Sequence, residues 1–127
     1  MEDHQIQKTR TGLDRIARAF EISLKGLRAA WLEKAFRQEV ALSIVLVPLA
    51  LVLGRSWAET MMMLLAVGLV LICEIANSAL EAVVDRIGPE FHPLSGRAKD
   101  MGSAMVLVAI VLCVLAYGGV IVGHLRA

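Results

Sequence analysis

The chain has 127 residues, enough for one domain, and 57% of them are hydrophobic. The mean hydropathy of +0.68 exceeds that of a soluble globular domain and indicates a membrane protein. The formal net charge of only +1 gives no reason to expect a nucleic-acid partner. Cys73 and Cys113 lie singly in apolar runs, which predicts buried thiols rather than a disulfide framework or a metal site.

The N-terminal part of the chain predicts an amphipathic helix over about residues 13–35. Apolar side chains recur there at the spacing of one helical face: Ile16, Phe20, Leu24, Leu27 and Trp31. Basic residues occupy other positions, as in helices that lie on a membrane surface. We therefore expect a surface helix on the cytoplasmic side of a membrane. The alternative is an ordinary helix that packs on a soluble core.

Three apolar runs follow, and they predict transmembrane helices over about residues 36–54, 57–87 and 97–125. Pro48 can bend the first of these helices. Gly119 and Gly123 in the third form a small-xxx-small pair, which is a hint of close helix packing. The fold class predicted from these elements is an all-α membrane protein with three transmembrane helices and an N-terminal surface helix.

Local signals predict where the second and third helices begin. Ser56 and Glu59 match the S-x-x-E capping box, so the second helix is expected to start near Trp57. Two prolines and two glycines make residues 88–96 a loop. Ser95 is the candidate N-cap of the third helix.

The basic residues predict the orientation in the membrane. Eleven of the thirteen Lys and Arg residues lie either before residue 38 or between Arg86 and Lys99, and only Arg55 and Arg126 lie elsewhere. The positive-inside rule then places the N-terminus and the loop between the second and third helices in the cytoplasm. Three spans place the C-terminus on the other side.

The second predicted span carries a polar stripe, which we define as Glu74, Asn77, Glu81 and Asp85. Asn77, Glu81 and Asp85 each lie within about 60° of Glu74 around the helix axis. A carboxylate at the centre of a transmembrane helix costs about 2.5–3.5 kcal/mol, so it needs a partner, a water-filled cavity or a function. A structural ion pair with Arg97, Lys99 or the N-terminal helix is the favoured interpretation for Asp85, whereas a functional role is favoured for Glu74.

The spacing of the stripe predicts different roles for its two glutamates. Glu74 and Glu81 are about 10.5 Å apart along the axis. They cannot ligate one Mg²⁺, whose oxygen ligands lie at about 2.0–2.1 Å. Glu81 could hold a hard cation, Mg²⁺ or Ca²⁺, together with Glu33 or Glu39. Glu74 is better placed to meet a group attached to a lipid.

The start of the third span supplies cations that could meet phosphates. Arg97, Lys99 and Asp100 lie there, and the sequence contains no Walker-type phosphate-binding loop. Nucleotide chemistry, if present, would therefore use other groups. The alternative is that these side chains only extend toward water from the membrane interface.

Four motifs together resemble a known family, the prokaryotic integral-membrane diacylglycerol kinases. They are KGLRAAW (Lys25–Trp31), AFRQE (Ala35–Glu39), EIANSALEAVVDRIG (Glu74–Gly88) and SGRAKDMGSA (Ser95–Ala104). The resemblance covers about residues 12–125. It implies a single integral-membrane kinase domain over residues 1–127 that transfers the γ-phosphate of Mg-ATP to diacylglycerol, giving phosphatidic acid and ADP. It also implies a homotrimer in the bacterial inner membrane, with cytoplasmic active sites shared between subunits.

The resemblance further implies roles for individual residues. Glu74 corresponds to the general base, and Glu33 and Glu81 to ligands of the metal–nucleotide complex. Asn77, Lys99 and Asp100 correspond to further catalytic positions, of which Lys99 and Asp100 also bind the nucleotide. Nucleotide-contacting positions are matched by Arg15, Glu90 and His92. Lipid-site positions are matched by Arg28, Trp31, Glu39 and Ser103.

Two other functions fit parts of the pattern. The first is phosphorylation of undecaprenol, although the FRQE and GLRAAW segments favour diacylglycerol. The second is a non-enzymatic protein that conducts cations along the polar stripe. A cation path should place ionisable groups on both sides of the midplane, whereas the third predicted span has none after its cytoplasmic start until His124.

Overall fold

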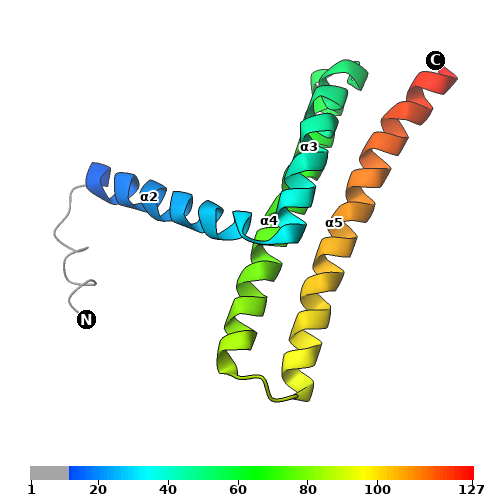
Figure 1. The fold of residues 1–127 in the computed structure, drawn as a ribbon. Coiled ribbons are helices and arrows are strands. Elements are labelled where there is room, and N and C mark those ends of the chain that lie inside the picture. The colour runs from blue at the N-terminus through cyan, green and yellow to red at the C-terminus, as the bar shows by residue number, and fades with distance from the viewer. Residues whose placement is uncertain (1–11) are drawn as a thin grey trace. The chain divides into compact units, whose positions relative to one another are not determined.

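The computed structural model describes residues 12–127, and in this part of the chain all regular structure is helical. The helices are α2 (Gly12–Trp31), α3 (Lys34–Leu53), α4 (Trp57–Ile87) and α5 (Pro93–Arg126) (Figure 1). The last three are long and apolar enough to cross a membrane. The predicted all-α fold with three potential spans is therefore confirmed. The chain divides into two units, one up to Leu32 and one from Glu33 to Ala127.

The first unit contains α2, whose end differs from the prediction. The helix expected over 13–35 stops at Trp31, where the backbone N–H of Leu32 donates to the carbonyl of Ala29 in a final turn. Glu33 has an extended backbone and forms the N-cap of α3. The break coincides with a change in pattern, because the single apolar stripe ends at Trp31 and the chain from Lys34 becomes apolar on most sides.

The turn between α3 and α4 follows the predicted capping pattern. The Ser56 side chain accepts a hydrogen bond from the backbone N–H of Glu59 at 3.2 Å, and α4 begins at Trp57. Glu59 does not complete the capping box, because its carboxylate accepts from the backbone N–H and the guanidinium of Arg55 instead. A side chain at Gly54 would overlap Thr60, so this tight turn requires glycine.

The start of α5 corrects the expected cap at Ser95. His92 is the N-cap, and its Nδ1 accepts a hydrogen bond from the backbone N–H of Leu94 at 3.1 Å. Pro93 takes the first helical position, where its missing N–H costs nothing. At the other end of the loop, Gly88 has a φ of 149°, which glycine adopts readily. The third span therefore starts four residues earlier than the 97 predicted.

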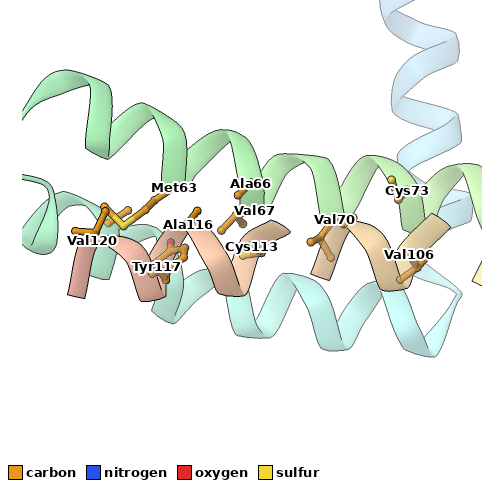
Figure 2. Packing of buried hydrophobic residues seen from close by; sticks show 12 residues of the cluster. Met63, Ala66, Val67, Val70, Cys73, Val106, Cys113, Ala116, Tyr117 and Val120 are labelled. Carbon is orange, nitrogen blue, oxygen red and sulfur yellow. The ribbon is translucent and has the colours of Figure 1, made fainter. Parts of the chain in front are cut away.

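The core of the second unit lies between α4 and α5, with α3 packed on α4 (Figure 2). Small residues spaced by seven, Gly102, Ala109 and Ala116, are buried along α5 and allow α4 to approach closely. Both cysteines are free and buried, as predicted. The expected Gly119/Gly123 pair does not form this contact: Gly119 faces open space, and Gly123 lies against the Arg55 side chain.

Helix length places one end of the unit outside the hydrocarbon layer. At 1.5 Å per residue, α3 is about 30 Å long, α4 about 46 Å and α5 about 51 Å. A bilayer core is about 30 Å thick, so α3 just spans it. The short α3–α4 turn holds those helix ends together, and Figure 1 shows α4 and α5 running past the Lys34 end of α3 to their loop. The excess length of α4 and α5 is therefore at the loop end.

Candidate active site at the loop end of helices α4 and α5

The polar stripe of α4 crosses the boundary that these lengths define. Measured from Trp57, Glu74 lies about 25 Å along the axis, Glu81 about 36 Å and Asp85 about 42 Å. With a hydrocarbon layer of about 30 Å, Glu74 lies just inside its edge and the other two carboxylates lie beyond it. The stripe therefore leads from the edge of the lipid into water.

Glu74 is the one buried charged side chain among residues 12–127, with 7% of its surface exposed. The charges that act on it are the carboxylates of Glu39 on α3 and Glu81 on α4, both of its own sign. In the described part of the chain it forms no ion pair. A buried carboxylate that pairs with no cation among residues 12–127 has a cost that packing does not explain, and a functional role for Glu74 stays a prediction.

Asp85 has the structural partner that was expected for it. The Lys99 Nζ atom on α5 lies 2.6 Å from Asp85 Oδ1, and both side chains are substantially exposed. Glu81, one turn earlier on α4, also acts on the Lys99 charge. The pair joins α4 to α5 at the outer end of the polar stripe and leaves the predicted phosphate-binding cation within electrostatic reach of Glu81.

Asn77 on α4 lies against Gly102 on α5. Its Oδ1 atom is buried and has no hydrogen-bond partner within the described residues. A side chain at Gly102 of α5 would overlap this atom and would lie 3.2 Å from Asn77 Cγ. Sequence reasoning missed Gly102, although the seven-residue spacing of small residues in α5 could have indicated it.

The remaining predicted residues of the second unit lie around this end. Asp100 and Ser103 are exposed on α5, near Lys99 in the chain. Glu90 and His92 line a cavity of about 330 Å³ at the loop. Since the His92 Nδ1 accepts the capping hydrogen bond, only Nε2 is left to contact a ligand.

Not all predicted site residues belong to this unit. Arg15, Arg28 and Trp31 lie on α2 in the first unit, so the second unit by itself does not bring them to the stripe. Glu33 is the N-cap of α3, but its carboxylate makes no capping hydrogen bond. It is therefore not committed to holding the helix end.

The side chains of residues 12–127 do not by themselves assemble a metal site. Among residues 12–127, no three His, Cys, Asp or Glu side chains are grouped so that they could hold a metal ion. Mg²⁺ is usually held by one or two carboxylates, with waters and substrate phosphates completing its shell. The partly exposed Glu81 and the uncommitted Glu33 fit that kind of site, in which the nucleotide brings the remaining ligands.

An apolar groove of about 440 Å³ lies between α3, α4 and α5. Glu39 is the one charged residue among those that line it, and Leu46, Val70 and Tyr117 are typical of the rest. Tyr117 donates a hydrogen bond from its hydroxyl to the carbonyl of Leu46 at 2.5 Å, which satisfies its polar group. The groove thus joins hydrocarbon-like walls to a carboxylate near Glu74.

The fold and the site define a small helical membrane protein with a group of carboxylates where two of its spans leave the lipid. Comparison with known proteins gives the family. The sequence profile of prokaryotic diacylglycerol kinase matches residues 21–121. The diacylglycerol kinase of Escherichia coli K12 is 53% identical over 108 residues, 84% of this chain and 88% of the relative.

Two further relatives extend the match. The diacylglycerol kinase of Haemophilus influenzae is 46% identical over 112 residues, 87% of this chain and 95% of the relative. That of Pseudomonas aeruginosa is 46% identical over 117 residues, 91% and 95% of the two chains. The chain belongs to the prokaryotic diacylglycerol kinase family. The resemblance found in the sequence and the expected enzyme class, a lipid kinase, are confirmed.

Proposed function

We propose that the chain transfers the γ-phosphate of ATP to the hydroxyl of diacylglycerol at the polar stripe, giving phosphatidic acid and ADP. The observation that carries this proposal is that Glu74 is buried at the depth where α4 leaves the hydrocarbon and pairs with no cation among residues 12–127. A lipid hydroxyl reaches that depth from one side, and a water-soluble nucleotide reaches Glu81 and Lys99 from the other. Family membership supports the same reaction.

Glu74 acts as the general base. Its carboxylate accepts the proton of the lipid hydroxyl while that oxygen attacks the γ-phosphorus, and the bond from the γ-phosphorus to the β–γ bridging oxygen breaks to release ADP. A base in this role must come within about 2.6–3.2 Å of the hydroxyl oxygen. After transfer, the proton passes from Glu74 to water.

The nucleotide is held at the outer part of the stripe. Glu33 and Glu81 would hold the Mg²⁺ that accompanies ATP, and when bound the ion would supply charge neutralisation and orientation of the phosphate chain. Lys99 donates hydrogen bonds to phosphate oxygens as a point charge. The remaining nucleotide and catalytic positions are Arg15, Asn77, Glu90, His92 and Asp100.

The lipid is held at the inner part of the polar stripe, near Glu74. The residues proposed to contact it are Arg28, Trp31, Glu39 and Ser103. The apolar groove that Glu39 helps to line offers a wall for acyl chains. The helix α2 lies on the membrane surface with its exposed Ile16 and Phe20 in lipid, because its opposite positions are basic.

The enzyme is a single kinase domain that acts as a homotrimer in the bacterial inner membrane, with sites shared between subunits. Within one chain, at most 33% of the most apolar window of any span is buried, which leaves helix faces available for other subunits. The distribution of Lys and Arg places the loop end and the N-terminus in the cytoplasm, where ATP is present.

The substitution Glu74→Gln tests the proposal, because it keeps the shape of the side chain and removes the base. We expect lipid phosphorylation to fall by about 10²- to 10⁴-fold, the usual contribution of a general base, while binding of an ATP analogue stays near normal. The measurement is transfer of label from γ-labelled ATP in mixed micelles that contain either diacylglycerol or undecaprenol.

Glu59→Gln is the matched control, since Glu59 lies on the same helix at the opposite membrane face. It should retain normal phosphorylation. Near-normal turnover by Glu74→Gln would show that Glu74 is not the base. Transfer to undecaprenol in place of diacylglycerol would contradict the proposed substrate, and transfer to neither lipid would contradict the kinase assignment.

A further inference from the structure

Asp85 has no role in the proposed reaction, yet it makes a short ion pair with Lys99 on another helix. The 2.6 Å separation between Lys99 Nζ and Asp85 Oδ1 is at the short end for a charged hydrogen bond. The two residues come from different helices and meet across the α4–α5 loop. The pair therefore decides where the Lys99 ammonium group lies relative to the polar stripe.

We propose that Asp85 is a positioning residue, which holds the Lys99 ammonium group at the outer end of the polar stripe so that it meets the phosphates of the incoming nucleotide. This inference rests on the proposed function, in which Lys99 contacts phosphate. An ammonium group has three N–H donors, and Asp85 engages one. Two donors stay available for phosphate oxygens without breaking the pair.

The energetics favour positioning over a purely structural role. The side chains are 44% exposed for Lys99 and 65% for Asp85, and exposed ion pairs contribute little to folding. A lysine side chain has many rotamers, so a free Lys99 would lose conformational freedom when it binds a phosphate. Asp85 already restrains the Lys99 side chain in the free enzyme. Nucleotide binding therefore costs less conformational entropy at Lys99.

A second contact between α4 and α5 helps to hold Lys99 at the position where it meets Asp85. Asn77 contacts Gly102 two turns along α4 from Asp85, which fixes the rotation of α5 against α4 near Lys99. Glu81 also attracts the ammonium group toward the stripe. An inhibitory pair, in which Asp85 withdraws Lys99 from the nucleotide, is the opposite interpretation, and it predicts tighter nucleotide binding when Asp85 is neutralised.

The test is a double-mutant cycle in the full-length enzyme, with Asp85→Asn, Lys99→Met and both together. The two readouts are equilibrium binding of a non-hydrolysable ATP analogue, and kcat and KM for ATP in mixed micelles. We expect Asp85→Asn to lower kcat/KM for ATP roughly tenfold, mainly through KM, as for a displaced contact group. Lys99→Met should lower it further, and the double variant should equal Lys99→Met, because Asp85 acts only through Lys99.

Two further variants guard against misfolding and general charge effects. Asp85→Glu keeps the carboxylate and should recover most of the lost nucleotide binding. Glu59→Ala breaks the other exposed ion pair of α4, between Arg55 and Glu59 at 3.1 Å, and should leave ATP kinetics unchanged.

Three results overturn the inference while leaving the kinase proposal intact. The first is that Asp85→Asn leaves the ATP kinetics unchanged. The second is that Asp85→Asn binds the ATP analogue more tightly. The third is that Asp85→Asn lowers kcat/KM for ATP by the same factor in the Lys99→Met background as in the unmodified enzyme. Normal ATP kinetics in Lys99→Met alone would instead refute the phosphate contact of Lys99 in the proposed function, and the role of Asp85 with it.

Discussion

At the scale of single residues, Gly102 is the position whose side chain would disturb the site most directly. A methyl group there would overlap the Asn77 amide, whose oxygen is already buried and without a partner in the described residues. We expect Gly102→Ala to displace that amide and to lower kcat for lipid phosphorylation roughly tenfold, because a misplaced polar group next to Glu74 alters the geometry of transfer. Steady-state kinetics in mixed micelles measure this.

Gly96→Ala is the matched control for this substitution. Gly96 lies on the same helix, and a methyl group there would meet no atom within 4 Å. Alanine at that position should leave activity unchanged and could stabilise α5 by about 0.5–1 kcal/mol through its higher helix propensity. If Gly102→Ala behaves like Gly96→Ala in both activity and stability, the close contact between Gly102 and Asn77 does not contribute to function.

At the scale of helices, the end of the bundle opposite the loop is tied together by polar contacts of its own. His124 Nε2 lies 2.6 Å from the carbonyl oxygen of Leu53, and Arg55 donates to the carbonyl of Gly123 at 3.1 Å. These bonds connect the α3–α4 turn to the last turns of α5. The end far from the polar stripe is thus held by contacts that do not involve the proposed catalytic residues.

The substitution His124→Ala should therefore affect stability without affecting catalysis. We expect the free energy of unfolding to fall by about 0.5–1.5 kcal/mol, the net contribution of one hydrogen bond, with kcat and KM unchanged. Thermal unfolding in detergent and the mixed-micelle assay measure the two quantities. Arg126→Ala, two residues on, serves as control and should change neither. A loss of activity at unchanged stability would show that this end of the bundle takes part in the reaction.

At the scale of the whole molecule, the proposed role of Glu74 predicts that activity depends on the thickness of the bilayer. Glu74 lies about 25 Å along α4 from Trp57, close to the edge of a hydrocarbon layer of about 30 Å. A thicker layer would bury Glu74 and move it away from the nucleotide. A thinner layer would leave it in water, away from the lipid hydroxyl.

We therefore expect phosphorylation to be fastest at one lipid chain length and slower on both sides of it. The measurement is initial rate in vesicles of phosphatidylcholines whose acyl chains lengthen in steps, with ATP saturating and the diacylglycerol fraction fixed. Mismatch costs are modest per ångström, so the decline should be gradual. Rates that do not depend on chain length would contradict the placement of Glu74 at the boundary.

Features that depend on neighbouring residues were accessible from the sequence. Ser56 and Glu59 predicted the start of α4 at Trp57, and hydrophobic runs predicted three spans, because capping and lipid exposure act locally. The cap at Ser95 was wrong, since His92 and Pro93 compete for the same role a few residues earlier. The polar stripe also followed from helical periodicity alone. The roles of its residues, which the family resemblance implied, stay predictions.

The sequence by itself therefore determined the class of fold, the family and the presence of carboxylates on one face of the second span. Only the tertiary structure decided that Lys99 pairs with Asp85, that Asn77 contacts Gly102 and that Glu74 is buried. The physical reason is that periodicity sets the direction of each side chain around its own axis. Contacts between helices depend on the rotation and shift of α5 against α4, which packing of small residues along their whole length selects.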